Sequence, residues 1–493
     1  MFGEWKGTAT MLSHSVAHAD VHFSPEQQDS AFQAFKRAYP AFESTWKLDE
    51  LRATEYSRLD RLGQVYLDYT GGGLYAESQL RDHIALLDNA VFGNPHSKNL
   101  TSMAMTELVE RARDAVLDYF RASADEYMVI FTPNATGALK LVGESYPFAA
   151  GDRYLLTFDN HNSVNGIREF ARAKGASVTY VPILPPDLRV DTDQLIQELN
   201  TPTRAQHKLF AYPAQSNFTG VQHPLEWIAY AQSLGWDVLL DAAAFAPTNR
   251  LDLSQWHPDF VDISFYKIFG YPTGTGCLLV RKAAAQKFVR PWYAGGTITF
   301  SSVVTSDHYL TPGAAGFEDG TVNYLSIPAV ELGLRFIESV GIEMIHTRVA
   351  CLTGWLIEQL LTLTHSNGNP VIQLYGPANM HMRGGTVQVN FFDPDGALID
   401  CTIVERMANT ERISLRAGCH CNPGARETAL GFTQDELAVC FKDKASQTFE
   451  QFLQVIDGKT TGALRASVGI VTTFEDVYRY VAFAEGFVDR YVG

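Results

Sequence analysis

The chain has 493 residues, 46% of them apolar, and its 39 lysines and arginines against 55 aspartates and glutamates give a formal net charge of −16 at pH 7. Because a nucleic-acid backbone is bound by clustered cations, we expect a chain this acidic not to bind nucleic acid. It has no run of 18 apolar residues and no apolar stretch after a basic N-terminus, so we expect neither a membrane span nor a secretory signal.

The first part of the chain, residues 1 to about 60, combines an irregular start with two helical patterns, over 25–42 and 48–59. From Gln64 onward, short apolar runs alternate with helical stretches. Such alternation predicts an α/β fold in which a mostly parallel central sheet is covered by helices on both faces. The predicted strands are 65–69, 127–132, 153–158, 177–183, 208–214, 237–243, 261–266 and 276–282.

The pattern changes near Ser326. A long helical pattern over 327–363 is followed by predicted strands at 386–392 and 413–418 and by a closing helix at 473–488. This order predicts a second, smaller α+β domain. We therefore divide the chain into an N-terminal segment that packs with the small domain, a large domain and a small C-terminal domain, with bounds 1–60, 61–325 and 326–493.

The residues that follow the predicted strands are candidates for a binding site, because ligands of open α/β sheets bind at the carboxyl ends of the strands. Small residues at 134–137 follow one strand and lead into a helical pattern, whose exposed N–H groups would suit a phosphate. An ordinary helix cap is the alternative. His161 follows the next strand. A histidine there is structural or exposed unless a flat ring needs a stacking partner.

Asp241 and Lys267 follow two further strands and are 26 residues apart. Asp241 ends an apolar run, where a carboxylate needs a cation, although capping the next helix is an alternative. A buried lysine is equally costly unless it is paired or reacts. Together they meet the needs of pyridoxal 5'-phosphate, since a lysine forms a Schiff base with its aldehyde and an aspartate keeps its ring nitrogen charged. Ser264 and Tyr266 offer hydroxyls to its phosphate.

Two segments, SFYKIFGYPTG (264–274) and GCHCNPGA (418–425), are specific enough to indicate a family. With their neighbours they resemble the class V aminotransferase superfamily of fold-type I pyridoxal-phosphate enzymes, and more narrowly the desulfurase part of the molybdenum-cofactor sulfurases. The resemblance runs from Tyr66 to Gly424 and continues at 456–469, so it covers most of the chain. The other matching stretches are VYLDYTGGGLYAESQL, GNPHS, DNHNSVNGIREFA, YPAQSNFTGVQHPL, LLDAAAFAPT, FEDGT and IDGKTTGALRASVG.

The resemblance implies a role for each matching position. Lys267 would hold pyridoxal phosphate as a Schiff base, Asp241 would pair with its ring nitrogen, and His161 would stack on its ring and relay protons. Asn217 would bond the ring hydroxyl. The phosphate would be bound by Ala135, Thr136, Ser264 and Tyr266. The resemblance also implies a homodimer, in which Thr297, after paired glycines, reaches the phosphate held by the second copy.

The six cysteines are too sparse for a disulfide framework in a chain of this length, which favours the reducing cytoplasm. Cys419 and Cys421 form a C-x-C pair, but no second pair at fitting spacing accompanies them, so we expect no metal site. The resemblance implies that Cys421 is the catalytic cysteine and that Arg416, five residues earlier, binds the substrate carboxylate. We expect inert buried thiols at Cys277, Cys351, Cys401 and Cys440.

The implied reaction is that of a cysteine desulfurase of the molybdenum-cofactor sulfurase type. Lys267 would remove the α-proton of L-cysteine, the Cys421 thiolate would take its sulfur as a persulfide, and alanine would leave. The sulfur would then pass to an acceptor protein or to the molybdenum cofactor. Sulfurases usually carry another cysteine after the NPGA stretch and a downstream cofactor-binding domain, whereas this sequence has Arg426 there and ends at Gly493. Both differences bear on sulfur delivery, not on sulfur abstraction.

Two other functions stay open on the sequence. Another class V enzyme, such as a C–S lyase, β-eliminase or epimerase acting on a specialised amino acid, would need Lys267 and Asp241 but could dispense with Cys421. A catalytically silent binding or sulfur-carrier protein would need none of the three. The colour of bound cofactor separates the silent protein from the enzymes, and loss of activity in Cys421→Ser with cofactor retained separates the desulfurase from the lyase.

Overall fold

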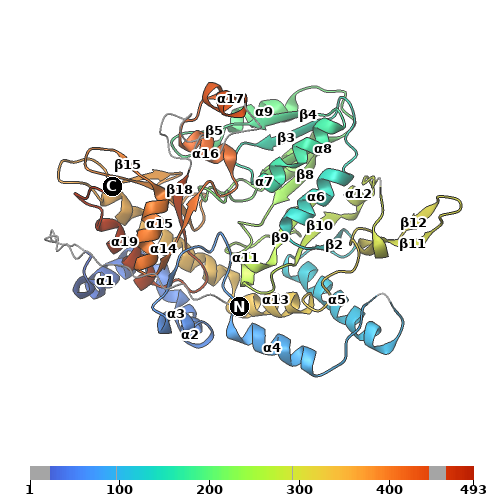
Figure 1. Ribbon diagram of the computed structural model, residues 1–493, viewed down its shortest axis with the longest axis horizontal. Helices are drawn as coiled ribbons and strands as arrows, with labels where there is room; N and C mark the ends of the chain where they lie inside the picture. Colours follow the sequence, from blue (N-terminus) through green and yellow to red (C-terminus); the bar gives the residue numbers. More distant parts are fainter. Residues whose placement is uncertain (1–22, 96, 291, 443–461, 493) are drawn as a thin grey trace, which may run out of the picture.

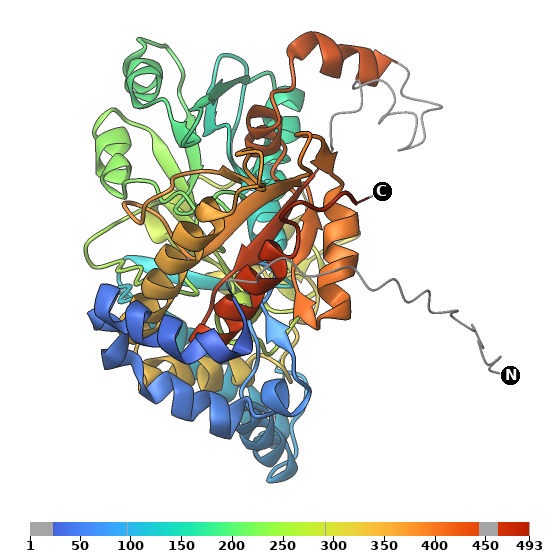
Figure 2. The same ribbon diagram turned by 90° about the vertical axis from the view of Figure 1, so that its left-hand side faces the viewer.

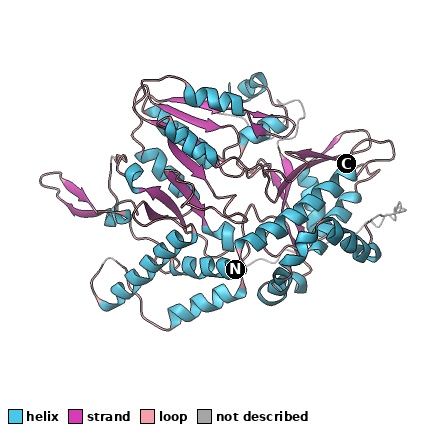
Figure 3. Cartoon of the chain, turned by 180° about the vertical axis from the view of Figure 1, so that it is seen from behind, coloured by secondary structure: helices cyan, strands magenta, loops and turns pink. Residues whose placement is uncertain are grey.

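The structure, a computed structural model, describes residues 23–95, 97–290, 292–442 and 462–492. It contains a seven-stranded sheet and a five-stranded sheet, each with helices around it (Figure 1). Seen from behind, the strands of these two sheets form separate groups, and a two-stranded hairpin lies apart from both (Figure 3). None of the described helices combines the length and the apolar character that a membrane crossing requires.

The seven-stranded sheet has the strand order β2-β10-β9-β8-β7-β3-β4. Its strands are β2 (Tyr127–Thr132), β3 (Arg153–Thr157), β4 (Ser177–Val181), β7 (Lys208–Pro213), β8 (Asp237–Asp241), β9 (Phe260–Ser264) and β10 (Gly276–Arg281). All run in one direction except β10, which is antiparallel to both neighbours. The connection from β9 to β10 through α11 (Phe265–Phe269) is too short for a parallel crossover, so the chain re-enters the sheet reversed. The predicted mostly parallel sheet is confirmed.

Alternate side chains of this sheet enter two separate apolar clusters, one on each face. On β8, Leu239 belongs to the same cluster as Leu139 of α6, whereas Val238 and Leu240 belong to the other. Because both faces are buried, the strands read as continuous apolar runs in the sequence. The other elements of this part of the chain are α4 (Glu77–Asp88), α5 (Leu100–Tyr119), α6 (Ala135–Ser145), α7 (Asn162–Asn165), α8 (Ile167–Ala173), β5 (Ile183–Leu184), β6 (Arg189–Val190), α9 (Thr192–Asn200), α10 (Glu226–Ser233) and α12 (Lys282–Ala285).

The smaller sheet has the order β13-β14-β18-β17, with β15 paired to β14. Its strands are β13 (Ile372–Tyr375), β14 (Thr386–Phe392), β15 (Leu398–Ile399), β17 (Arg416–Gly418) and β18 (Ala463–Ser467). The predicted strand 386–392 is β14, whereas 413–418 divides into β17 and β16 (Ile413–Ser414). The predicted strand 65–69 is wrong in extent and placement: only β1 (Val65–Tyr66) forms, and it pairs with β16, outside the large sheet. An apolar run indicates a strand but not its partner.

The helical pattern predicted over 327–363 is two helices, α13 (Pro328–Val340) and α14 (Ile342–Thr362). They separate at Gly341, whose φ of +92° is incompatible with a right-handed helix. The closing helix predicted at 473–488 is α19 (Phe474–Glu485). Among the described residues of this part, the remaining α-helices are α15 (Cys401–Thr410), α16 (Pro423–Ala429) and α17 (Gln434–Lys442).

The N-terminal helices lie against α14 and α19 (Figure 2). They are α1 (Gln28–Ala38), α2 (Lys47–Glu55) and α3 (Arg58–Arg61), with 3-10 turns at Pro25–Gln27 and Pro40–Thr45. The rings of Phe35 and Phe474 are 4.9 Å apart, and the buried guanidinium of Arg52 pairs with the buried Asp476 at 2.6 Å. Segments from opposite ends of the sequence thus form one core, while domain boundaries at 60 and 325 stay a prediction.

A two-stranded hairpin projects from the body of the protein (Figure 1). It consists of β11 (Ile298–Ser301) and β12 (His308–Leu310). Its tip presents two apolar side chains, Val303 and Val304, which are 99% and 90% exposed. Apolar side chains at such exposure on a projecting arm are typical of a surface that contacts another protein.

Candidate active site

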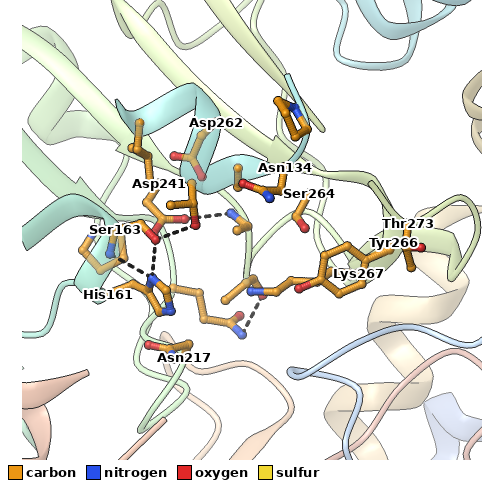
Figure 4. A pocket seen from close by; sticks show the side chains of 18 of the residues that line it. Asn134, His161, Ser163, Asn217, Asp241, Asp262, Ser264, Tyr266, Lys267 and Thr273 are labelled. Carbon is orange, nitrogen blue, oxygen red and sulfur yellow. Dashed lines mark hydrogen bonds between the residues drawn. The ribbon is translucent and has the colours of Figure 1, made fainter. Parts of the chain in front are cut away.

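The carboxyl ends of β3, β7, β8 and β9 border a cavity of about 380 Å³ (Figure 4). Parallel strands bring their carboxyl ends to one edge of a sheet, which is why residues far apart in sequence meet there. Of the residues predicted for the site, those lining the cavity are Ala135, Thr136, His161, Asn217, Asp241, Ser264, Tyr266 and Lys267. Those outside its lining are Thr297, Arg416 and Cys421.

The first turn of α6 forms one side of the cavity. Asn134 caps this helix, because its side-chain oxygen accepts the N–H of Gly137 at 2.9 Å. The first N–H groups of a helix have no intrahelical acceptor, and Ala135 and Thr136, which carry two of them, border the cavity. The helix is therefore both capped, as the alternative reading expected, and able to receive an anion at its positive end.

His161 lines the cavity from the start of α7, where its ring serves as the helix cap. Its Nδ1 accepts the N–H of Ser163 at 3.1 Å, so a neutral ring carries its proton on Nε2. Burial lowers the pKa of His161, and the nearby charge of Lys267 lowers it further. Ser163, which sequence reasoning missed, also meets the hydroxyl of Thr136 at 2.8 Å. Ser163 could have been predicted from the sequence, because it lies in the polar turn that follows His161.

Asp241 ends β8 and points its carboxylate into the same cavity (Figure 4). It is 7% exposed, and its Oδ1 accepts the N–H of Ala243 at 3.0 Å. Directly across the strand pair lies Asp262, a second buried carboxyl that sequence reasoning missed. The signal was an acidic residue inside the apolar run 260–265. Burial raises the pKa of Asp262 well above its ordinary value, and the charge of Asp241 raises it further.

Lys267 extends into the cavity from α11 and is half-buried. Its Nζ has no hydrogen bond or ion pair with any described residue, so the amine is available to a ligand. Close backbone packing holds α11 in place: the N–H of Gly73 donates to the carbonyl of Tyr266 at 3.0 Å. A Cβ on Gly73 would lie 2.8 Å from the carbonyl oxygen of Lys267, which explains the glycine there. The backbone that carries the amine is thereby fixed.

The cysteine loop, defined here as residues 418–422, is tied to the edge of the large sheet. The carbonyl of Cys421 accepts the N–H of Asn162, the neighbour of His161, at 2.7 Å. Asn422 donates its side-chain amide to the carbonyl of Asp159 at 2.7 Å. Cys421 itself is exposed, and its φ of +55° is unusual for a residue with a side chain. The loop therefore lies next to the cavity wall, while Cys421 itself is not among the lining residues.

Asn217 lies between the cavity and the cysteine loop. Its amide nitrogen donates to the carbonyl of His420 at 2.7 Å, and its oxygen accepts from Asn422 at 3.0 Å. One N–H of the amide is left for a ligand, since an amide nitrogen carries two. Asn217 therefore has one N–H group available for the predicted contact with a ring hydroxyl. The hydrogen bonds that its side chain makes in the structure are to the cysteine loop.

Two arginines share one aspartate beside the cysteine loop. Arg416, half-exposed, contacts Asp68 at 2.6 Å, and Arg465, 3% exposed, contacts the other oxygen of Asp68 at 3.0 Å. Arg465 also donates to the carbonyl of Asn217 at 3.1 Å, which places it against the cavity wall. Burial lowers the pKa of Arg465, although Asp68 counteracts it. Sequence reasoning missed Arg465; the signal was a cation within the small, apolar stretch 463–468.

Thr297 is buried at the base of the β11–β12 hairpin, where its hydroxyl accepts the N–H of Ala294 at 3.0 Å. Its predicted contact with a second copy of the chain stays a prediction. The structure places three other cysteines, Cys277, Cys351 and Cys401, in the interior as free thiols. Burial raises their pKa values, which makes them poor nucleophiles. Cys440 lies outside the residues whose side chains are described.

The family can be stated from a match over most of the chain. A family model described as aminotransferase class-V matches residues 65–480. The chain belongs to the class-V aminotransferase family. The chain is 36% identical to the molybdenum cofactor sulfurase of Solanum lycopersicum over 498 residues, which cover 93% of this chain and 59% of the relative. It spans about half the length of the curated relatives it matches, with 51% for the sulfurase of Homo sapiens.

Solved structures with the same fold extend the comparison. The cysteine desulfurase from Thermococcus onnurineus NA1 aligns with a TM-score of 0.71 and 23% identity, over 89% of this chain and 97% of that one. The cystine C–S lyase C-DES, in a complex with cysteine persulfide, aligns with a TM-score of 0.64 and 17% identity, over 86% and 98%. Likeness at this identity concerns the fold, and it confirms the predicted fold-type I architecture of the chain.

Proposed function

We propose that this protein is a pyridoxal-phosphate-dependent cysteine desulfurase of the molybdenum-cofactor sulfurase type. It takes sulfur from L-cysteine as a persulfide on Cys421 and releases alanine. One observation carries the proposal: Lys267 and Asp241 line one cavity, and the loop of Cys421 is hydrogen-bonded to the residue next to His161 in its wall. The names of the curated relatives and of a structural neighbour support the same reaction class.

The residues of the cavity fit pyridoxal phosphate. The start of α6 offers N–H groups and the hydroxyl of Thr136 to a phosphate. The buried carboxylate of Asp241 lacks a cation among the described residues, and a protonated ring nitrogen would supply one. Lys267 has a free amine for an aldehyde. When bound, the cofactor supplies an aldehyde that combines with the substrate amine and a ring that withdraws electrons from its α-carbon.

Each side chain of the site has a separate role in removing sulfur from cysteine. Lys267 would hold the cofactor through its amine, and that amine would also accept the α-proton of the substrate. Asp241 would keep the proton on the ring nitrogen. The Cys421 thiolate attacks the substrate sulfur: a sulfur–sulfur bond forms, the carbon–sulfur bond breaks, and its electron pair stays on the substrate carbon. That carbon takes a proton, Lys267 returns a proton to the α-carbon, and the product leaves as alanine.

Arg465 is the stronger candidate for binding the substrate carboxylate, with Arg416 as its partner. Arg465 is buried, its position is fixed by Asp68, and it touches the backbone of Asn217 in the cavity wall. Arg416 also pairs with Asp68 but is half-exposed. A buried fork of this kind binds a carboxylate more strongly than an exposed one, because less water competes.

The test is incubation of the purified holoenzyme with L-cysteine. We expect the amount of alanine to equal the amount of sulfide that a reductant releases. We also expect the mass of the peptide that carries Cys421 to increase by one sulfur atom. Cys421→Ser should retain cofactor colour and lose both products, while Cys419→Ser in the same loop serves as the matched control. A Cys421→Ser enzyme with full alanine production would contradict the persulfide route.

A C–S lyase or related elimination on a specialised amino acid is the second candidate. The observation that favours it is the place of Cys421, which is exposed and outside the lining of the cavity. A lyase needs Lys267 and Asp241 alone, so it would release sulfide without a persulfide on the protein. Pyruvate in place of alanine among the products would identify this reaction.

We further propose that the protein is a cytoplasmic homodimer. The projecting hairpin, with Val303 and Val304 exposed and Thr297 at its base, supports contact with a second copy. The free thiols of all five cysteines whose side chains are described support a reducing compartment. The exposure of Cys421 supports transfer of its sulfur to an acceptor protein or to the molybdenum cofactor.

A further inference from the structure

A carboxyl group that the proposed reaction does not use, that of Asp262, lies beside Asp241. The register of β8 and β9 makes these two residues direct partners, so their side chains leave the sheet on the same face at about 5 Å spacing. Both line the cavity (Figure 4). Asp262 is 1% exposed, and neither of its oxygens has a hydrogen-bond donor among the described residues.

An ionised Asp262 would be a buried charge without a partner and next to a like charge. Either condition alone is strongly unfavourable, and two carboxylates this close do not both ionise near neutral pH. The titratable groups that face Asp262 are Asp241 from β8 and Lys267 from α11, whereas the thiol of Cys277 on β10 belongs to the apolar cluster on the other face of the sheet. Only Lys267 favours its ionised form, and burial together with Asp241 outweighs it, so that the pKa of Asp262 is raised.

Asp241 is the better placed member of the pair to carry the negative charge. It is more exposed than Asp262, and the N–H of Ala243 stabilises its charge at 3.0 Å. Each carboxylate oxygen has two acceptor sites. Asp241 can therefore accept from Ala243 and from one further donor and still keep a site for a cation in the cavity.

We propose that Asp262 is a positioning residue that keeps its proton at neutral pH and donates it in a hydrogen bond to the carboxylate of Asp241. The pair then carries one negative charge, held in a fixed orientation at the place where Asp241 meets the cofactor ring. This role rests on the proposed function, because it gives Asp241 the ring nitrogen as its partner. Such coupled carboxyls titrate as a pair.

The first experiment uses the protein without cofactor. Difference infrared spectroscopy across neutral pH should show the carbonyl stretch of a protonated carboxylic acid in the wild type and in Asp237→Asn, and none in Asp262→Asn. Asp237 is the matched control, a buried aspartate of β8 that pairs with Lys287 at 2.5 Å. In Asp241→Asn, where the neighbouring charge is gone, the band should disappear at a lower pH. A wild type without the band at pH 7 overturns the proposal.

The second measurement is the pH dependence of unfolding. A carboxyl with a raised pKa takes up a proton on folding, so the unfolding equilibrium constant of the wild type should increase about tenfold more per pH unit above pH 4 than that of Asp262→Asn. Equal slopes contradict a protonated Asp262.

The third measurement tests positioning with pyridoxal phosphate itself. Asparagine can still donate to Asp241, whereas alanine cannot, so Asp262→Asn should bind the cofactor within about threefold of the wild type and Asp262→Ala about tenfold more weakly. Equal affinities of the two variants overturn the positioning role. If the wild type shows the infrared band but does not bind pyridoxal phosphate, the proposed function is wrong. If the wild type binds pyridoxal phosphate but lacks the band, only the role of Asp262 is wrong.

Discussion

The side-chain amide of Asn217 donates to the backbone carbonyl of His420 at 2.7 Å, across 203 residues of sequence. The same side chain accepts from Asn422 at 3.0 Å, so it holds the cysteine loop on both sides of Cys421. Because Asn217 also lines the cavity, the position of the thiol depends on a residue of the cavity wall. The loop and the cavity are one structural unit.

Asn217→Ala should slow sulfur transfer to Cys421 about 100-fold at saturating cofactor, because a displacement of about 1 Å in a reacting group costs about that much rate. The rate of persulfide formation in a single turnover, followed by mass spectrometry, measures the effect. Asn200→Ala, on the exposed face of α9, is the control. Unchanged transfer in Asn217→Ala would show that the loop is positioned by its other contacts.

Arg465→Lys should raise the KM for cysteine about 10- to 100-fold, since lysine cannot reproduce a bidentate, charge-assisted contact with a carboxylate. Arg416→Lys should raise it less, because Arg416 is half-exposed. Steady-state kinetics on folded variants compare the two. If Arg416→Lys raised the KM more than Arg465→Lys, Arg416 would be the residue that binds the substrate carboxylate, as the family resemblance implied.

The protein should lose stability at acid pH through His420. Burial, with a smaller contribution from Arg465, lowers the pKa of His420 to about 2. The unfolded chain, with a histidine pKa of about 6.5, takes up a proton that the folded chain does not, so the free energy of unfolding decreases as pH falls below that value. Between pH 7 and pH 5 the wild type should lose about 2 kcal/mol more than His420→Gln. An equal loss of unfolding free energy between pH 7 and pH 5 in the wild type and in His420→Gln would refute this prediction.

Asp476→Ala should reduce the free energy of unfolding by about 3–5 kcal/mol, because it leaves the buried guanidinium of Arg52 without its buried partner. Replacing both, as Arg52→Met with Asp476→Leu, should be milder, since no charge is then left in the core. Urea denaturation measures both. If the single and double variants lost the same free energy, packing of α2 on α19 and not the charge would be the cause.

Val303→Lys combined with Val304→Lys should weaken a dimer, because the two side chains are almost fully exposed at the tip of the projecting hairpin. Sedimentation over a range of concentrations measures the association. Val91→Lys, an equally apolar position that is 76% exposed elsewhere, is the control. A wild type that is monomeric at all concentrations would remove the role proposed for the hairpin and for Thr297.

Strands and cavity residues of the large sheet were predictable because each strand is buried on both faces and the polar residue that ends it stands out. Asp241 and Lys267 were found in this way. The partner of the strand at Val65 and the helix break at Gly341 were not, since the first depends on a contact with Ile413 and the second on one backbone angle. Arg465 and Asp262 were missed because a single charge inside an apolar run does not reveal what it faces.

The sequence alone was sufficient to assign the fold class and to place an aspartate and a lysine at the ends of neighbouring strands. Both inferences rest on periodicity and residue type, which are local properties. Only the tertiary structure decided that Asp262 lies across from Asp241, that two arginines share Asp68, and that Asn217 holds the loop of Cys421. These contacts join residues up to 397 positions apart. Register and long-range packing, which set them, result from the burial of the whole chain and are not encoded in any single segment.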